Sequence, residues 1–480
     1  MNLEEGAEGA RVTTTDEAQD RVPRPVPVKD KPLRPTSAYP TLSVMARLTL
    51  PDALNTAENP LDVPMGSTGG HAAVSRRFLL QLARALHKHG TPAHRLETAL
   101  AITARRLGLE AEFFSTPTSI MVGIGNLDDQ RVSLLRVEPG EPNLGHLSTL
   151  GDITRGVIEG TLSPAEGLSQ VEALDQQPPP YPQWLVLFAF VCSSAAVSCF
   201  LKVRVGDVLT ASFLGLLTGV IALVASRRES TRHVTEPLAA FVVTAVAFTI
   251  DGVMGTRSGF ATSLAGLVVL LPGLTFTVAL TELSTRHLAS GTARLSGAIV
   301  VFLGLGFGLA LGAQTGGALG PILHETLPSL RGALSRAELP GWTEWIALLV
   351  APLSFAVLLS AKRRDIGSIV VACGAAYLVS KYAGASVGEQ LGAFLGAFVV
   401  SAGSNLFARL KRRTSMVTQV PGLLILVPGS IGLRSMQSLL GQDVEMGIAT
   451  GFRVAIIGIS LAAGLLAGNV VTSAVNRIRR

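Results

Sequence analysis

Ten long apolar segments between residues 184 and 472 limit this chain to one class of fold. Each segment is long enough, or nearly so, to cross the roughly 30 Å hydrocarbon core of a bilayer as a helix. Lipid offers the backbone no hydrogen bonds, so such segments cross it as α-helices. The segments cover residues 184–201, 208–225, 237–254, 260–282, 293–313, 342–360, 366–381, 389–407, 416–438 and 448–472. The sequence therefore predicts an α-helical polytopic membrane protein with ten transmembrane helices, of which the seventh is the shortest.

The composition agrees with this class and excludes others. Charged residues make up 15% of the 480 residues, against about 25% in soluble proteins. The surplus of Lys and Arg lies beside apolar segments rather than along a polar face, so we expect no nucleic-acid partner. The three cysteines, Cys192, Cys199 and Cys373, lie inside apolar segments and indicate neither a disulfide framework nor a metal site. We expect a lipid bilayer as partner, no cofactor and no metal.

The first 183 residues are more polar and divide into two parts. Residues 1–73 are rich in proline and contain no long apolar stretch, so we expect a disordered leader. Residues 74–177 alternate helical and strand-like patterns, which predicts a small soluble α/β domain. Its expected strands cover residues 110–116, 118–125 and 130–137, and its later helices are expected to begin at Asn143 and at the Ser163–Glu166 capping box.

A turn between the first two helices of this domain is surrounded by histidines. Gly90-Thr91-Pro92 predicts the end of one helix and the start of the next, with Thr91 as the N-cap. His87, His89 and His94 flank the turn without the spacing or the partner ligands of a metal site. We therefore expect solvated histidines at helix ends.

The distribution of Lys and Arg predicts the orientation in the membrane. Basic residues are concentrated in the loops on one side, such as residues 362–364 and 409–413. The positive-inside rule places those loops, and both termini, in the cytoplasm. That arrangement requires an even number of spans.

Two parts of the membrane region resemble each other at an offset of 156 residues, which superposes Leu270-Leu271-Pro272-Gly273 on Leu426-Val427-Pro428-Gly429. The same offset superposes the glycine pairs Gly266 and Gly422, Gly291 and Gly447, Gly308 and Gly464, and Gly312 and Gly468. We interpret this as a duplication into two five-helix repeats, residues 184–313 and 342–472. Because five is odd, the second copy enters the membrane in the opposite sense, and inverted repeats are typical of secondary transporters.

Each repeat carries Pro-Gly pairs inside an apolar segment, at residues 272–273, 421–422 and 428–429. Proline removes a backbone N–H and frees a carbonyl, and such helix breaks form substrate sites in transporters. The predicted substrate-binding residues are Pro272, Gly273, Thr275, Gln419, Pro428, Gly429, Ser430 and Arg434. The alternatives are proline kinks that only shape packing and, for Arg434, a side chain that snorkels to the interface.

Two carboxylates are candidates for proton coupling. Asp251 lies inside the third segment and Glu282 closes the fourth. Carboxylates within a membrane are costly and often functional, and burial can raise their pKa enough to carry a proton. Both also lie near segment ends, where water can solvate them.

No nucleophile–base arrangement of an enzyme is visible in residues 74–175. The chain also contains no Walker A or G-x-G-x-x-G pattern. We therefore expect neither an enzyme nor ATP-driven transport.

Several stretches resemble the threonine/serine exporter family. The N-terminal domain of that family is similar to residues 79–90, 94–97, 107–110 and 116–118, and its C-terminal half is similar to residues 420–430. The resemblance covers about residues 74–475 and implies a ten-span exporter with a cytoplasmic N-terminal domain, driven by the proton gradient. Within that domain, Arg95 and Glu97 are expected to form a structural ion pair.

The leading hypothesis is a secondary transporter that exports threonine and serine across a bacterial inner membrane. Export of a C4-dicarboxylate such as succinate is the first alternative, because relatives of the family are associated with that substrate. A membrane-anchored hydrolase or sensor is the second alternative. The sequence leaves the oligomeric state open, a homo-oligomer included.

Overall fold

The computed structural model describes residues 69–126, 128–138, 140–227, 234–326, 337–426 and 444–478. All of them belong to one compact unit, residues 43–480. The predicted disordered leader, as far as residue 68, lies outside the described residues. Four predicted substrate-binding residues also lie outside them, namely Pro428, Gly429, Ser430 and Arg434.

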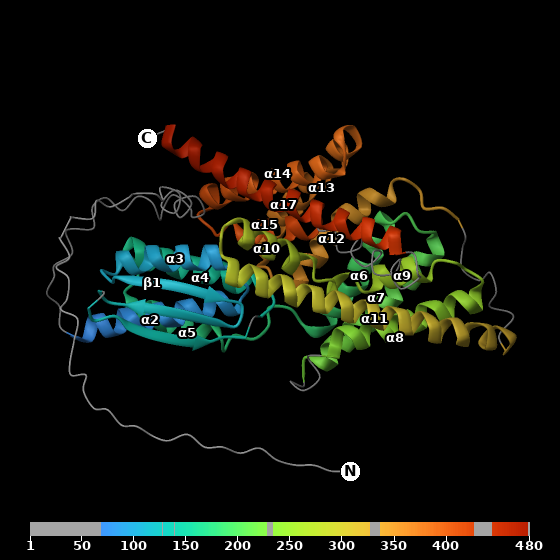
Figure 1. Ribbon diagram of the computed structural model, residues 1–480, viewed down its shortest axis with the longest axis horizontal. Coiled ribbons are helices and arrows are strands. Elements are labelled where there is room, and N and C mark those ends of the chain that lie inside the picture. Colours follow the sequence, from blue (N-terminus) through green and yellow to red (C-terminus); the bar gives the residue numbers. More distant parts are fainter. Residues whose placement is uncertain are drawn as a thin grey trace, which may run out of the picture. The chain divides into compact units, whose positions relative to one another are not determined.

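The first part of the described chain, residues 69–175, folds as helices beside a small sheet and is called the α/β region (Figure 1). The three strands are antiparallel in the order β1-β2-β3, with Phe114 opposite Met121 and Met121 opposite Leu134. The elements are α2 (Gly69–Lys88), α3 (Ala93–Arg106), β1 (Ala111–Thr116), β2 (Ser119–Ile124), β3 (Arg131–Arg136), α4 (Leu144–Glu159) and α5 (Pro164–Leu174). All three predicted strands are therefore confirmed.

Local capping explains where two of these helices begin. The Asn143 side chain accepts a hydrogen bond from the His146 N–H at 2.9 Å, at the start of α4. At the start of α5, Glu166 accepts from the Ser163 N–H at 2.8 Å while the Ser163 hydroxyl accepts from the Glu166 N–H. Both caps satisfy helix N–H groups that have no partner inside the helix. The capping box and the start of α4 at Asn143 were both predicted.

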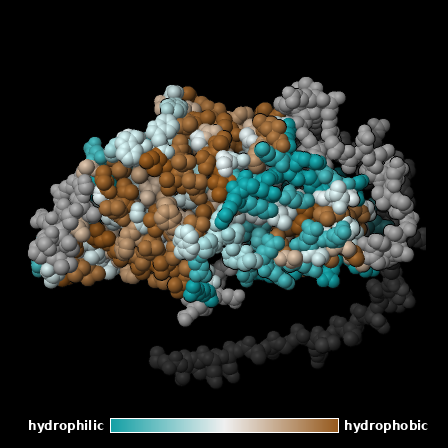
Figure 2. Space-filling model, turned by 180° about the vertical axis from the view of Figure 1, so that it is seen from behind, coloured by the Kyte–Doolittle hydropathy of each residue, from teal (hydrophilic) through white to brown (hydrophobic). Residues whose placement is uncertain are grey.

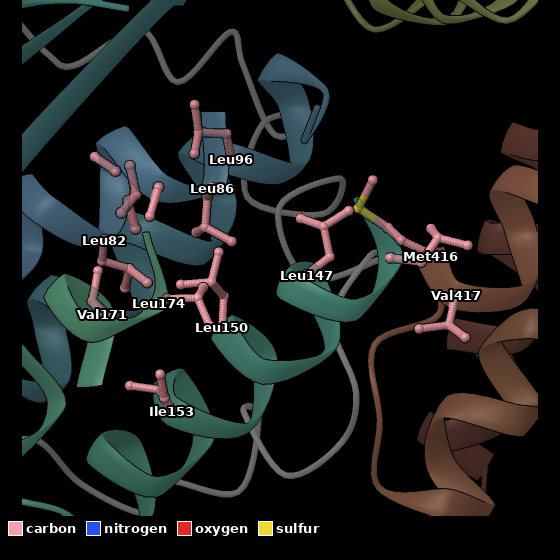
Figure 3. Close-up of a cluster of buried hydrophobic side chains, with 14 of the residues drawn as sticks. Leu82, Leu86, Leu96, Leu147, Leu150, Ile153, Val171, Leu174, Met416 and Val417 are labelled. Carbon is pink, nitrogen blue, oxygen red and sulfur yellow. The ribbon is translucent and has the colours of Figure 1, made fainter. Parts of the chain in front are cut away.

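The core of the α/β region continues into the rest of the chain. Buried leucines of α2, α3 and α4 pack together, and Leu147 of α4 faces Met416 of α15 (Figure 3). The same cluster includes Ile369 and Cys373 of α13. This apolar contact fixes the α/β region against the helices that follow.

Residues 183–478, called the membrane region, are helical. The helices are α6 (Gln183–Phe200), α7 (Val205–Ala225), α8 (Thr235–Met254), α9 (Gly259–Gly266), η4 (Val268–Leu270), α10 (Gly273–Ser284), α11 (Leu288–Thr326), α12 (Thr343–Leu358), η6 (Arg363–Asp365), α13 (Ile366–Val387), α14 (Glu389–Lys411), α15 (Met416–Leu424) and α17 (Val444–Ile478). Among the described residues, seven helices are long and apolar enough to cross a membrane, or eight with the bent pair from α9 to α10. The chain is a multi-pass helical membrane protein, and a count of ten stays a prediction.

Pro272 interrupts the fourth predicted segment. Leu271 and Pro272 are not helical and separate η4 from α10. A bend of 56° lies a few residues earlier, between α9 and residues 268–284. The predicted break at this pair is confirmed. The predicted break at Pro421-Gly422 is wrong, because α15 runs through Pro421. There Gly422 lies against the side chain of Val400, which holds the helix in place.

Two helix lengths differ from the sequence prediction. The seventh segment was expected to be the shortest, but α13 has 22 residues, whereas α12 has only 16. The fifth was expected to end at residue 313, but α11 continues to Thr326. Glycines explain the extension, because Gly312 and Gly316 let α11 lie against the backbone of α8.

The helices pack in two groups with similar internal contacts. In residues 183–326, α8 packs along α11, and α9 contacts both α7 and α8 (Figure 1). In residues 343–478, α14 packs along α17, and α15 contacts both α13 and α14. The groups, called the first and second helical halves, meet where α6 contacts α12 and where α10 contacts α17.

The surface of the membrane region is apolar, as expected for lipid contact. Large side chains such as Phe213, Leu303 and Phe452 are exposed on these helices. On the face shown in Figure 2, apolar side chains cover much of the membrane region, whereas hydrophilic side chains gather over the α/β region.

Candidate functional site

A cavity of about 110 Å³ lies where the α/β region meets both helical halves. Its walls come from the start of α3, the loop at residues 140–142, α10 and α11 of the first half, and α15 and α17 of the second. The polar residues of its lining are His94, Arg95, Thr275, Thr281, Arg294, Gln419 and Asn469. By the same measure one water molecule needs roughly 10–15 Å³, so the cavity has room for a small metabolite.

Backbone contacts hold the α/β region beside this cavity. The N–H groups of Leu144 and Gly145 donate to the carbonyls of Leu359 and Ser360, at 2.9 and 3.1 Å. The Tyr181 hydroxyl donates to the Ala361 carbonyl at 2.7 Å. Because these bonds join α4 and the segment between α5 and α6 to the end of α12, they satisfy carbonyls that the helix leaves free.

Glu282 lies at the centre of the contact between α3 and the first helical half. Its side chain is fully buried, and it accepts hydrogen bonds from the Ala93 N–H at 2.8 Å and the Ser290 hydroxyl at 2.7 Å. Arg294 pairs with the same carboxylate at 3.1 Å. Glu282 thus caps α3, and its negative charge is also stabilised by the positive N-terminal end of the helix dipole.

The predicted N-cap of α3 was therefore wrong. Pro92 occupies the N-cap position, and the buried Thr91 hydroxyl has no hydrogen-bond partner among the described residues. The carboxylate of Glu282 takes the place that Thr91 was expected to fill. It comes from a residue 189 positions away in the chain.

The predicted ion pair between Arg95 and Glu97 is also wrong. Arg95 is buried and donates to the Ser415 hydroxyl at 3.0 Å and to the Gln419 side-chain carbonyl. Glu97 instead accepts from the N–H and hydroxyl of Ser115, each at 2.8 Å, and pairs with His287 at 3.3 Å. The two side chains separate because the membrane region offers each its own partners.

The histidines around the Gly90 turn are buried rather than solvated, which corrects the sequence prediction. The His87 Nε2 lies 2.8 Å from the Pro117 carbonyl oxygen, and the His89 Nε2 lies 3.1 Å from the His146 Nδ1. Burial, with a smaller contribution from the positive form of His146, lowers the pKa of His89 to about 4. The turn is buried because α4 and the end of the sheet pack against it.

Two histidines at the cavity side behave differently. Burial, reinforced by the charge of Arg95, lowers the pKa of His94 well below its ordinary value. For His287, burial acts in the same direction, but the hydrogen bond and charge of Glu97 outweigh it and raise the pKa. His94 is therefore neutral at pH 7, and the raised pKa of His287 favours its protonated form.

Asp251 lies outside the lining of the cavity. It accepts from the Gly259 N–H at 2.7 Å and from Thr256 and Ser258, so it caps the start of α9. Ser258 also donates to Asp207 at 2.5 Å, which places two carboxylates around one hydroxyl. Asp207 precedes an apolar segment like an ordinary loop charge, so nothing in the sequence marks it as a partner of Asp251.

The structure brings together only part of the predicted substrate site. Thr275 and Gln419 both line the cavity, whereas Pro272 and Gly273 lie outside its lining, at the start of α10. The cavity also contains Arg95, Arg294 and Asn469, none of which was selected. Both arginines lie at or beyond the ends of the apolar segments, so nothing in the sequence relates them to Gln419.

The described residues contain no group of three His, Cys, Asp or Glu side chains that could hold a metal ion. The expectation that the chain uses no metal or cofactor stays a prediction. The polar groups that line the cavity are guanidinium, amide, hydroxyl and imidazole groups. These groups bind small polar or anionic molecules through hydrogen bonds.

Comparison with known proteins identifies similar chains. Family models for threonine/serine exporters match residues 77–316 and, under the description "Threonine/Serine exporter, ThrE", residues 344–471. Pheromone-regulated membrane protein 10 of Eremothecium gossypii is 26% identical over 79% of this chain and 51% of its own length. The protein of that name from Debaryomyces hansenii is 29% identical over 77% of this chain and 37% of its own length. The one from Saccharomyces cerevisiae is 27% identical over 76% of this chain and 47% of its own length.

This chain therefore spans about half, or less, of the length of these relatives. No solved structure matches it.

Proposed function

Because the chain belongs to the threonine/serine exporter family, we propose that it is a secondary transporter that exports threonine and serine from the cytoplasm. The observation that carries this proposal is the cavity shared by the α/β region and both helical halves. A site between two halves is what alternating access requires. Thr275 lies in the first turn of α10, just after the interruption at Pro272, where an interrupted helix leaves polar groups available to a substrate.

Matching contacts in the two helical halves support an inverted repeat. A side chain at Gly308 would collide with the Pro237 carbonyl, and one at Gly464 would collide with the Phe394 carbonyl. Likewise, Gly266 faces Val243 in the first half, and Gly422 faces Val400 in the second. The proposal includes ten spans, both termini in the cytoplasm and residence in a bacterial inner membrane.

Efflux from proteoliposomes tests the proposal. Purified protein is reconstituted with threonine or serine on one side, and release is followed with and without an imposed pH gradient. Thr275→Val is expected to slow efflux about tenfold or more, because it removes a hydroxyl from the cavity lining. Thr292→Val, at an exposed position of α11, is the matched control and should transport normally. Equal efflux from empty vesicles would exclude the amino-acid export proposal.

Glu282 is the better placed of the two candidate proton carriers. It contacts Arg294, which lines the cavity, whereas Asp251 caps α9 away from it. Protonation of Glu282 would weaken its hold on both Arg294 and α3. In the same vesicles, Glu282→Gln should make efflux insensitive to the pH gradient, while Asp251→Asn should keep that sensitivity. The opposite pattern would assign coupling to Asp251.

Export of a C4-dicarboxylate is the second candidate function, and one observation favours it. The described residues that line the cavity include two arginines and no Asp or Glu. An amino acid would therefore have to place its ammonium group against neutral oxygens, whereas a dicarboxylate would not. Parallel efflux of succinate and threonine distinguishes the two. Hydrolysis of an ester or peptide by the purified full-length chain, without efflux of either, would favour the hydrolase alternative.

A further inference from the structure

Arg95 is a buried cation whose side chain reaches from the α/β region to the membrane region. It lies in the first turn of α3, and only 9% of its surface is exposed. Its guanidinium reaches α15 of the second helical half, where it donates to the Ser415 hydroxyl at 3.0 Å and to Gln419. Both of these partners are neutral.

No carboxylate of the described residues balances this charge. Glu97, two residues away, points to Ser115 and His287 instead. Arg294, the other arginine of the cavity, is paired with Glu282. A buried charge without a counter-ion is costly, because it has lost its hydration and gained no ionic partner. The contrast between the two arginines suggests that the counter-ion of Arg95 is not part of the protein.

The surroundings of Arg95 favour an anion in the cavity. Burial lowers the pKa of Arg95 only to about 10, so the guanidinium stays charged at neutral pH. His94 also lines the cavity, and its buried Nδ1 has no hydrogen-bond partner among the described residues. Both residues lie in the first turn of α3.

We propose that the guanidinium of Arg95 binds the carboxylate of the exported substrate inside the cavity. The inference rests on the proposed export function and adds the residue that recognises the substrate. Guanidinium and carboxylate form charge-assisted hydrogen bonds, often in pairs. The substrate would then contact the α/β region and both helical halves at once. The α/β region is thereby part of the transport site rather than an accessory to it.

Removing the carboxylate from the ligand and the guanidinium from the protein tests this pairing. Purified full-length protein binds labelled L-threonine or succinate, and L-threoninamide or succinamide competes. The wild-type protein should prefer each carboxylate over its amide by about 10- to 100-fold. Arg95→Gln should lose most of that preference. Arg105→Gln, at an exposed position of the same helix, should keep it.

The design separates recognition from folding. Melting of each variant without ligand shows whether it is folded, and Arg95→Gln should melt near the wild-type temperature because a buried unpaired charge is removed. If Arg95→Gln fails to fold, the preference of Arg95→Lys for carboxylate over amide tests the proposal instead. Arg95→Lys keeps the charge but not the paired geometry, so the preference should fall several-fold.

The outcomes for the two proposals are distinct. An unchanged preference for carboxylate in a folded Arg95→Gln or Arg95→Lys variant overturns the role of Arg95, while wild-type efflux of threonine or succinate leaves the export function standing. If the wild-type protein exports neither compound, the proposed function fails and this inference fails with it.

Discussion

The two carboxylates that the sequence selected lie in contrasting environments. Glu282 is fully buried at the junction with the α/β region and has a cation, Arg294, against it. Asp251 is partly exposed at the end of α8, and it accepts hydrogen bonds from hydroxyls and backbone N–H groups. Both carboxylates cap a helix, Glu282 capping α3 and Asp251 capping α9.

The difference shows that burial determines how much stability is lost when a carboxylate or its partner is removed. A partly exposed carboxylate at a helix start is solvated by water as well as by its cap, so its loss costs little. A fully buried carboxylate depends on its cation, so removing either partner leaves an uncompensated charge. We therefore expect the junction to be far more sensitive to single substitutions than the Asp251 site.

The largest expected effect follows from removing the cation at Glu282. Arg294→Met should reduce the free energy of unfolding by about 3 kcal/mol or more, because Glu282 would stay buried without its partner. Denaturation of the purified protein in mixed detergent micelles measures the loss. The double variant Arg294→Met with Glu282→Gln should recover part of it, because no unpaired charge is left.

Arg286→Met is the matched control for this experiment. Arg286 lies in the connection between α10 and α11, just before the helix that carries Arg294, but it is exposed, so its loss should cost well under 1 kcal/mol. Equal losses for Arg294→Met and Arg286→Met would contradict the idea that burial distinguishes the junction.

The second largest effect is expected on acidification, which should lower the free energy of unfolding through the buried histidine His89 of the α/β region. The pKa of His89 is about 4 against an ordinary value of 6.5, because of burial and then His146. Neutral His89 contributes fully to the free energy of unfolding above pH 6.5. This contribution is lost as the pH falls toward 4, because the unfolded chain binds the proton at a higher pH than the folded chain. Between pH 7 and 5 the loss should be about 1–2 kcal/mol. His287 has the opposite sign, since its raised pKa stabilises the fold at low pH.

Comparing pH profiles isolates the contribution of His89. His89→Gln should flatten the decline of stability between pH 7 and 5, and His146, Lys88 and Asp175, which also act on His89, stay unchanged in that comparison. Asp251→Asn should leave the slope as it is in the wild type. If His89→Gln has the wild-type slope, the buried histidines do not set the acid sensitivity of the α/β region.

The smallest expected effect lies at Asp251. Asp251→Ala removes the acceptor of the Gly259 N–H and should cost about 0.5–2 kcal/mol, as for other helix caps. Asp251→Asn keeps one acceptor oxygen and should cost less. Unfolding of the two variants in parallel measures the difference. A loss for Asp251→Asn as large as that for Arg294→Met would remove the contrast between the two carboxylates.

Features set by neighbouring residues were predicted from the sequence. The capping box at Ser163 and Glu166, the start of α4 at Asn143 and the helix break at Pro272 each depend on a few adjacent positions. The three strands followed from alternation over short stretches. The extension of α11 to Thr326 was missed, because it depends on glycines that pack against α8.

The candidate site was predicted only in part, for a related reason. Thr275 and Gln419 were selected because they lie near Pro-Gly pairs, and both line the cavity. Arg95 and Arg294 were missed because each lies at a helix end, where an arginine ordinarily faces water. Nothing local distinguishes either of them from Arg105, which is exposed on the same helix as Arg95.

The sequence by itself determined that this chain is a multi-pass helical membrane protein with an α/β region before it. Apolar length and periodicity are local quantities, and the bilayer imposes a single answer on them. Only the tertiary structure decided that Glu282 caps α3 and that Arg95 reaches Gln419. These partners are 189 and 324 residues apart in sequence. Such pairs are set by how the α/β region packs on the helices, which depends on the whole fold.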